Sequence, residues 1–281
     1  MSPIVERRVL APDVTLLRVR HPKIADRQRP GQFVIIRVAS GGERIPLTIA
    51  ASDEDTITLV VQAVGKTTQL LTAMQQGDEI TDVAGPLGTP STIERFGTVA
   101  VVGGGVGTAV AFPIAVALAE AGNCVHAVIG ARSRQHVLFE SELSAVCDAV
   151  HVCTDDGSHG RRGLVTDALS DLLATTPADR VFTAGPVAMM RAVAAVTRPA
   201  GIPTVASLNP IMVDGTGMCG GCRVSVDGKP HFACLDGPEF DAHRVDFDAL
   251  ANRNRGYVEW ERGQRAQRPR CALETVVGGE P

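Results

Sequence analysis

Several signals are missing from the sequence, and each absence excludes a class of protein. Lys and Arg number 27 against 31 Asp and Glu, so the net charge of −4 lacks the basic excess of a nucleic-acid-binding protein. The first residues, MSPIVERRVLAPDV, have no apolar segment of the kind found in signal peptides. We therefore expect a cytoplasmic protein whose partners do not include nucleic acid.

No stretch of the chain is expected to cross a membrane. The longest apolar run, Thr98 to Ala119, carries a cluster of glycines where a buried strand would turn into a helix. Hydrophobic residues make up 44% of the chain and charged residues 21%, which is typical of a globular protein. A length of 281 residues suggests two or three domains.

Hydrophobic patterning divides the chain into three regions. Residues 1–96 hold short alternating runs between turn signals, which predicts an antiparallel β-barrel. In residues 97–206 strand-like and helix-like segments alternate, which predicts a doubly wound parallel sheet; ESELSAVCD, residues 140–148, is one of the expected helices. Residues 207–281 hold a cysteine-rich segment and a charged tail that starts near Ala251. The expected fold class is a multidomain α+β protein with these three parts.

The clustered cysteines lack a fourth member. Cys219, Cys222 and Cys234 form a C-x2-C-x11-C pattern, and the other four of the seven cysteines are scattered. Without an export signal, this pattern favours a metal or redox site over disulfides. The pair Asp227-Gly228 predicts a two-residue hairpin turn, which brings Cys234 back to the loop of the other two.

The hairpin register also predicts which residues lie next to the cysteines. It places Cys222 opposite Ala233, and His231 opposite Val224, away from the cysteines. Glycines at positions 215, 217, 220 and 221 leave the loop free to wrap closely around an ion or cluster. Backbone N–H groups of such a loop can point at sulfur.

Two kinds of metal centre fit this segment. Structural zinc accepts three cysteines, usually with His or Cys as the fourth ligand. A plant-type [2Fe–2S] cluster uses C-x4-C-x2-C and a distant cysteine. With Asp214 in the first position, the chain reads D-x4-C-x2-C-x11-C, which is the same spacing. The spacing favours the cluster and leaves zinc open, and Asp214 could instead cap a turn beside three protein ligands.

The order of the regions and the stretch SLNPIMVDGTGMCGGC resemble a known family over nearly the whole chain. The chain is similar to electron-transfer subunits of dihydroorotate dehydrogenase, and more similar still to small subunits of NADH-dependent reduced ferredoxin:NADP+ oxidoreductase, also known as sulfide dehydrogenase. The first group has cysteine at the position of Asp214, and the second has aspartate. The resemblance therefore implies a [2Fe–2S] cluster held by Asp214, Cys219, Cys222 and Cys234.

The resemblance also implies a ferredoxin–NADP+ reductase fold with FAD on the barrel. RIPLTIA, residues 44–50, matches the flavin motif R-x-[YP]-[ST] or a variant with one residue more, so Arg44, Pro46, Leu47 and Thr48 would bind FAD. Arg44 would pair with the pyrophosphate through its planar fork, and Thr48 would lie near the flavin N5. Many relatives carry tyrosine in place of Pro46. This motif has no aromatic residue, so another group must cover that face of the ring.

A second FAD segment is implied by the stretch VQAVGKTTQLL. Gly65, Lys66, Thr67 and Thr68 would open a helix whose N-terminus suits a diphosphate. An ordinary capped helix is the alternative. GPLG, residues 85–88, would close the barrel.

The glycine-rich turn VAVVGGGVGTA is typical of a dinucleotide site, because it follows a strand and precedes a helix. Gly103, Gly105 and Gly107 would approach the phosphates, although Thr108 replaces the third glycine of G-x-G-x-x-G. The second strand ends in IGARSR, with no acid for the ribose of NAD. Arg132 and Arg134 could meet a 2′-phosphate or stay solvated at the surface, so the choice between NAD and NADP stays open.

Two later loops complete the predicted nucleotide site. Asp155 and Asp156 in TDDGSHGRRG could accept ribose hydroxyls, or they could form a plain turn. Gly185 and Pro186 end the fourth strand at the carboxyl edge of the sheet, where ligands bind in such folds. The resemblance places both segments near the dinucleotide.

The sequence thus predicts an NAD(P)H-dependent flavoprotein oxidoreductase with FAD, NAD(P) and [2Fe–2S] as cofactors. FAD would exchange a hydride with NAD(P)H and pass single electrons to or from the cluster, without a protein acid or base. By resemblance, the partner is a larger flavoprotein with [4Fe–4S] clusters, similar to the small subunit of glutamate synthase. Ferredoxin is a second possible partner, and the tail RNRGYVEWERGQRAQRPR would contact the partner or stay solvated.

Three alternatives stay open at this point. The first is an electron-transfer subunit that serves dihydroorotate dehydrogenase. The second is a non-catalytic, zinc-binding nucleotide sensor. The third is an NAD(P)H–ferredoxin reductase that works alone.

Overall fold

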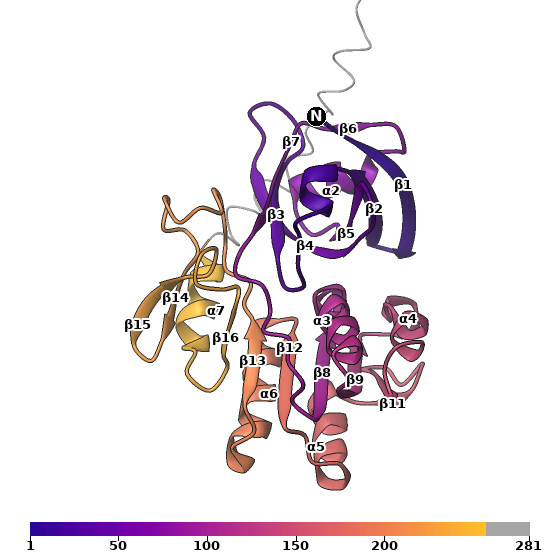
Figure 1. The fold of residues 1–281 in the computed structure, drawn as a ribbon, viewed down its shortest axis with the longest axis vertical. Helices are drawn as coiled ribbons and strands as arrows, with labels where there is room; N and C mark the ends of the chain where they lie inside the picture. The colour runs from indigo at the N-terminus through magenta and orange to yellow at the C-terminus, as the bar shows by residue number, and fades with distance from the viewer. Residues whose placement is uncertain (257–281) are drawn as a thin grey trace, which may run out of the picture.

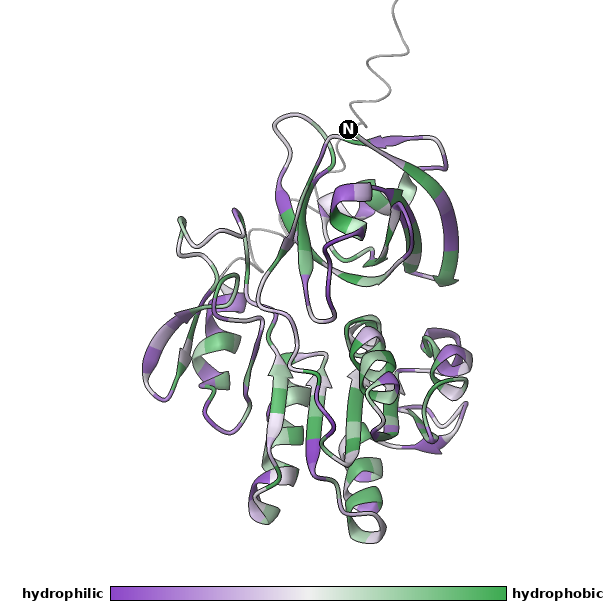
Figure 2. Cartoon of the chain, viewed as in Figure 1, coloured by the Kyte–Doolittle hydropathy of each residue, from purple (hydrophilic) through white to green (hydrophobic). Residues whose placement is uncertain are grey.

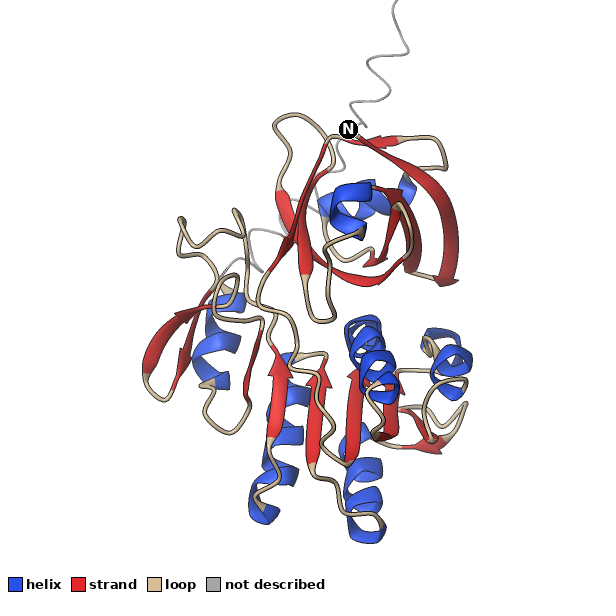
Figure 3. Cartoon of the chain, viewed as in Figure 1, coloured by secondary structure: helices blue, strands red, loops and turns tan. Residues whose placement is uncertain are grey.

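The structure is a computed structural model that describes residues 1–256 of the chain. A curled antiparallel sheet lies at one end, a parallel sheet flanked by helices lies at the other, and the C-terminal segment packs beside their junction (Figures 1 and 3). This architecture confirms the predicted fold class of three parts.

The first part is an antiparallel near-barrel. Its elements are β1 (Ser2–Ala11), β2 (Val14–Arg20), α1 (Pro22–Ala25), β3 (Phe33–Arg37), β4 (Arg44–Ser52), β5 (Thr56–Gln62), α2 (Lys66–Ala73), β6 (Glu79–Ile80) and β7 (Asp82–Leu87). The strand order is β6-β1-β2-β5-β4-β3-β7, and only Thr81 separates the two edge strands in the chain. The sheet therefore curls round on itself, and Leu71 of α2 packs into its core.

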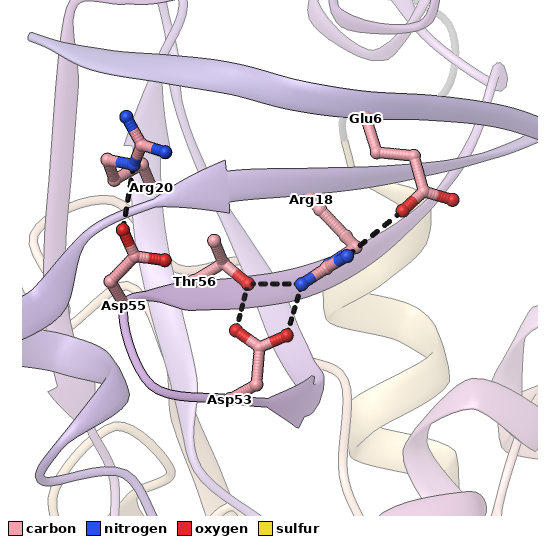
Figure 4. A network of polar contacts seen from close by, with 6 residues as sticks. All are labelled: Glu6, Arg18, Arg20, Asp53, Asp55 and Thr56. Carbon is pink, nitrogen blue, oxygen red and sulfur yellow. Dashed lines mark hydrogen bonds and ion pairs between the residues drawn. The ribbon is translucent and has the colours of Figure 1, made fainter.

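A network of charged side chains lies on β1, β2 and the turn between β4 and β5 of this barrel (Figure 4). Arg18 of β2 contacts Glu6 at 3.2 Å and the hydroxyl of Thr56 at 3.2 Å, and it also pairs with Asp53. Such exposed pairs contribute about 1 kcal/mol or less each. The barrel is consequently held by its apolar interior, and the network marks its solvent face.

The second part is a doubly wound sheet with the order β11-β10-β9-β8-β12-β13-β16. Its strands are β8 (Thr98–Gly104), β9 (Cys124–Ala131), β10 (Ala149–Thr154), β11 (Arg161–Arg162), β12 (Arg180–Ala184), β13 (Thr204–Ser207) and β16 (Glu239–Asp241). All neighbours pair in parallel except β13 and β16. The strand order reverses between β8 and β12, which creates the crevice where such sheets bind ligands.

Helices cover both faces of this sheet. They are α3 (Thr108–Glu120) and α4 (Glu140–Ser144) on one face, and α5 (Val165–Thr175) and α6 (Val187–Thr197) on the other. Val99 and Val101 of β8 pack with α3, whereas Ala100 and Val102 pack with α5 and α6. A strand buried on both sides needs apolar residues at every position, and Figure 2 shows the strands as largely hydrophobic.

Two expectations for this region have clear outcomes. The apolar run from Thr98 to Ala119 forms β8, a short turn and α3, and no helix in residues 1–256 has the length and hydropathy of a membrane span. The helix predicted over residues 140–148 is wrong at its end, since α4 stops at Ser144. Asp148 exchanges hydrogen bonds with Val125, which draws the chain into the sheet.

The C-terminal segment forms a hairpin and a helix. Its elements are β14 (Arg223–Val226), β15 (Lys229–Phe232) and α7 (Phe247–Arg255). Val226 pairs with Lys229 and Val224 pairs with His231, so the register predicted from Asp227-Gly228 is confirmed. Helix α7 runs past Ala251, where the tail was expected to begin, and most of the predicted tail lies outside the described residues.

The three parts share a junction. Strand β16 pairs with β13, where Glu239 lies opposite Ser207, and so it extends the parallel sheet. One apolar core contains Phe33 and Ile35 from β3, Met190 from α6, and Cys222 and Cys234 from the hairpin region. The cysteine segment is therefore packed against both other parts.

Buried Asn123 ties the linker that follows the barrel to the parallel sheet. Its Oδ1 accepts the N–H groups of Phe96 at 2.7 Å and Gly97 at 3.1 Å. Its Nδ2 donates to the carbonyls of Glu94 at 2.9 Å and Leu118 at 2.8 Å. One side chain thus satisfies four backbone groups around the entry into β8.

We expect Asn123→Ala to lower the free energy of unfolding by about 2–4 kcal/mol, because each buried polar group left without a partner costs about 1–3 kcal/mol. Urea unfolding measures the change. Ser170→Ala on the exposed side of α5 is the control, with an expected change within about 0.5 kcal/mol. Equal stability of the two variants would contradict this role for Asn123.

Candidate cofactor and metal site

A cavity of about 910 Å³ lies between the barrel and the carboxyl edge of the parallel sheet. Strand β4 borders it on one side, and the loops after β8, β9, β10 and β12 border it on the other. The predicted residues that line it are Pro46, Leu47, Thr48, Thr68, Gly105, Gly107, Arg132, Asp155, Gly185 and Pro186. The structure therefore brings the predicted flavin motif and the predicted dinucleotide loops to one space.

Close packing explains the glycine at position 107. A Cβ there would lie 2.5 Å from both the carbonyl oxygen of Ala184 and the Cα of Gly185. The start of α3 can therefore approach the end of β12 only with glycine at this position. The N-terminus of α3 thus opens toward the cavity, an arrangement that suits a phosphate.

An aromatic residue, Phe33, lies beside the RIPLT motif on the neighbouring strand. It stands on β3 directly opposite Thr48 of β4, and both residues line the cavity. Because strand residues alternate in direction, Thr48 and Pro46 share one face of β4. The neighbouring strand, which the motif does not include, therefore carries the ring.

The other predicted residues do not line this cavity: Arg44, Gly65, Lys66, Thr67, Gly103 and Asp156. The hydroxyl of Thr67 donates to Glu43. The carboxylate of Asp156 accepts the N–H of Ser158 at 2.9 Å and its hydroxyl at 2.6 Å, as a turn residue does. The side chains of Thr67 and Asp156 thus form hydrogen bonds with other residues of the chain.

The side chain of Thr68 in α2 folds back over the two residues that precede the helix. The hydroxyl of Thr68 accepts the N–H groups of Val64 at 3.0 Å and Gly65 at 2.9 Å. These bonds leave the N–H groups of Lys66, Thr67 and Thr68, the first residues of α2, without a side-chain acceptor among the described residues, and Thr68 also lines the cavity. The diphosphate role of residues 65–68 stays a prediction.

Arg44 lines a second cavity, of about 790 Å³, on the outside of the barrel. Arg37, Asp214 and Thr216 line it as well. Arg44, the first residue of the predicted flavin motif, therefore lies near the predicted cluster loop. Its pairing with a pyrophosphate stays a prediction.

Sequence reasoning missed a polar contact between the barrel and the sheet. His136 Nε2 lies 3.6 Å from Asp13 Oδ1, and Asp13 Oδ2 accepts a hydrogen bond from Gln62 Nε2 at 2.7 Å. Gln62 and His136 both line the first cavity. No local motif marks residues that are brought together only by the fold.

The cysteines form a buried pair and an exposed third member. The sulfurs of Cys222 and Cys234 lie 3.1 Å apart in the shared core, and the N–H of Cys234 points at the sulfur of Cys222 from 3.4 Å. Burial, followed by the neighbouring Cys222, raises the pKa of Cys234 to about 12. The thiol therefore holds its proton at neutral pH.

Asp214 and Cys219 lie on the glycine-rich loop above that pair. The carboxylate of Asp214 accepts the N–H of Thr216 at 2.8 Å and that of Cys219 at 2.6 Å. The bond from Thr216, followed by that from Cys219, holds the pKa of Asp214 below its usual range. The group is therefore an ionised acceptor, as both the ligand and the turn-cap interpretations require.

The side chains of Asp214, Cys219, Cys222 and Cys234 are of the types that bind an iron–sulfur cluster, but they do not converge on one point in this structure. Within the described chain, no three His, Cys, Asp or Glu side chains are arranged to hold a metal ion. The N–H of Gly221 points at the sulfur of Cys219 from 3.4 Å, as the loop was expected to allow. Cys219 and Asp214 would have to turn toward the buried pair, so the four-ligand set stays a prediction.

Comparisons with known proteins assign two parts of the chain to known domain families. Residues 209–246 match the iron–sulfur cluster binding domain of dihydroorotate dehydrogenase B, and residues 101–195 match the oxidoreductase NAD-binding domain. A protein of Thermotoga maritima, a homolog of the electron transfer subunit of dihydroorotate dehydrogenase B (NAD(+)), is 47% identical over 264 residues, 93% of each chain. The chain belongs to the dihydroorotate dehydrogenase B electron-transfer subunit family.

Other relatives support the same family. A probable electron transfer subunit from Methanopyrus kandleri is 32% identical over 237 residues, 84% of this chain and 88% of its own. A solved structure of NADH-dependent reduced ferredoxin-NADP oxidoreductase is 46% identical, with a TM-score of 0.89 over 93% of this chain and 95% of its own. The ferredoxin reductase of carbazole 1,9a-dioxygenase, at 20% identity and a TM-score of 0.62, shares the fold.

Membership of this electron-transfer subunit family confirms both the family resemblance noted in the sequence and the predicted enzyme class. The chain is an NAD-binding flavoprotein oxidoreductase of the ferredoxin–NADP reductase type, with an iron–sulfur cluster binding region. The type of cluster, its individual ligands and the partner stay predictions.

We expect Gly107→Ala to lower the free energy of unfolding by about 1–3 kcal/mol and to weaken NADH binding, because its new methyl group meets the backbone of β12. Gly65→Ala makes the same chemical change where the only neighbour within 4 Å is Thr68 Oγ1, at 4.0 Å. Denaturant unfolding of both variants, with NADH titration of Gly107→Ala, tests the expectation. A fully stable Gly107→Ala that binds NADH normally would contradict it.

Proposed function

We propose that this protein transfers electrons between NAD(P)H, FAD and a [2Fe–2S] cluster, and exchanges them with a larger flavoprotein partner. One observation carries the proposal: the cavity that joins the flavin motif to the dinucleotide loops adjoins the core that holds Cys222 and Cys234. Phe33 belongs to both. A dinucleotide, a flavin and a cluster bound at these places would lie one after another in space, with the flavin in the middle.

The residues of the chain would bind and orient rather than react. FAD, when bound, accepts a hydride from NAD(P)H and releases electrons one at a time. Thr48 lines the cavity, and Phe33 lies opposite it on the neighbouring strand. No side chain needs to carry a proton for hydride transfer.

The nucleotide would bind along the carboxyl edge of the sheet. Gly105, Gly107 and the N-terminus of α3 suit its phosphates. Asp155 suits ribose hydroxyls, and Arg132 suits a 2′-phosphate; both line the cavity. Because both chemistries are present, the choice between NAD and NADP stays open.

The partner would approach the cluster loop. Val213, Met218 and Leu235 are exposed there, and Met218 is 88% exposed. Exposed apolar side chains around a redox site suit a protein interface. A larger flavoprotein with [4Fe–4S] clusters is the proposed occupant, in line with the likeness to the ferredoxin-NADP oxidoreductase structure. The cytoplasmic location stays a prediction.

The test is an absorption spectrum of anaerobically purified protein, with flavin, iron and zinc assayed in the same sample. Flavin bands with about two irons per chain are expected for FAD and [2Fe–2S]. Zinc without iron or flavin would contradict the proposal and favour a zinc-binding nucleotide protein.

We expect Cys222→Ser to lose most of its iron while it keeps its flavin, because the buried thiol would be a ligand and lies outside the first cavity. Cys124→Ser is the control, since Cys124 is exposed and distant in the fold from the hairpin. Iron content unchanged in Cys222→Ser would contradict the ligand assignment.

Asp214→Ala tests the fourth ligand. If the carboxylate binds iron, its loss changes the electron paramagnetic resonance spectrum of the reduced cluster, and Asp214→Cys restores a stable cluster with a different spectrum. Asp227→Ala, in the hairpin turn, is the control. A spectrum that Asp214→Ala leaves unchanged would show that Asp214 only caps the turn.

A further inference from the structure

Glu239 is a half-buried acid that hydride transfer does not use. It stands on β16 opposite Ser207, which lines the cavity, and directly follows Pro238, another lining residue. Its Oε1 accepts a hydrogen bond of 2.5 Å from the hydroxyl of Ser91, in the linker after the barrel. The carboxyl group therefore lies where the barrel, the parallel sheet and the cysteine segment meet.

Glycine at position 31 permits this arrangement. A Cβ there would lie 2.2 Å from the Oγ of Ser91 and 3.3 Å from the Oε1 of Glu239. Gly31 also has a φ of +84°, a conformation that favours glycine. The barrel thus closes directly over the Ser91–Glu239 pair.

No charged group balances this carboxylate in the part of the chain that the structure describes. Strand β13 offers Ser207, the linker offers Ser91, and the barrel offers Gly31; none of these is charged. Burial raises the pKa of Glu239 to about 7, and the bond from Ser91 opposes that rise only in part. The group therefore exchanges its proton near neutral pH.

We propose that Glu239 takes up a proton when the neighbouring redox centres are reduced. The inference rests on the proposed function, because it needs a bound flavin and cluster. An electron that enters a site of low dielectric constant adds one negative charge there, which favours the neutral form of a nearby acid. Glu239 then binds one proton from solvent, and releases it when the electron leaves. No covalent bond other than the O–H bond changes.

The experiment is a redox titration of the anaerobic holoprotein between pH 6 and pH 8.5, with the cluster followed by electron paramagnetic resonance. The cluster is the centre to follow, since reduced flavin binds protons itself. In the native protein we expect the midpoint potential to fall as pH rises, by at most 59 mV for each tenfold drop in proton concentration. In Glu239→Gln we expect a potential that does not change with pH.

Glu94→Gln, an exposed acid on the same linker, is the control and should keep the native slope. Equal slopes in the native protein and Glu239→Gln, or a flat native profile, would overturn the inference. Native protein that binds neither cofactor would instead refute the proposed function.

A second variant covers failure of Glu239→Gln to fold. Ser91→Ala removes the bond that favours the ionised carboxylate, so the pH at which the potential changes slope should move upward. An inflection that stays in place would overturn the inference.

Discussion

The burial of two thiols in a core that all three parts share is the constraint on which the structure depends. Cys222 and Cys234 lie with Phe33 and Ile35 of the barrel and with Met190 of α6 in one apolar cluster. Well-packed interiors do not deform continuously. The cysteine hairpin therefore cannot move without the strand that borders the cavity, and the two sites keep a fixed separation.

Several short elements hold this shared junction together. Strand β16 has three residues, yet it extends the parallel sheet and delivers both Pro238 and Glu239 to the junction. Gly31 leaves room for the side chains of Ser91 and Glu239, and Gly107 lets the start of α3 meet the backbone at the end of β12. The junction thus joins a nucleotide-binding reductase fold to an iron–sulfur region without a flexible connection.

Local signals in the sequence predicted what local chemistry determines. Asp227-Gly228 set the hairpin register, and the glycines after β8 marked the turn into α3. The ring of Phe33, the contact between His136 and Asp13, and the carboxyl of Glu239 could not be predicted, because each depends on residues far apart in the chain. Asp148 likewise shortened α4 through a tertiary hydrogen bond.

In the proposed function, electrons pass from the dinucleotide to the cluster through a flavin held between them. Rapid mixing of the anaerobic holoprotein with NADH or NADPH, with flavin absorbance and the electron paramagnetic resonance of the cluster followed together, tests it most directly. The account predicts that the flavin is reduced first and that the signal of the reduced cluster then appears at the rate of flavin reoxidation. A flavin that is reduced while the cluster stays oxidised, or a cluster that is reduced in protein stripped of flavin, would contradict it.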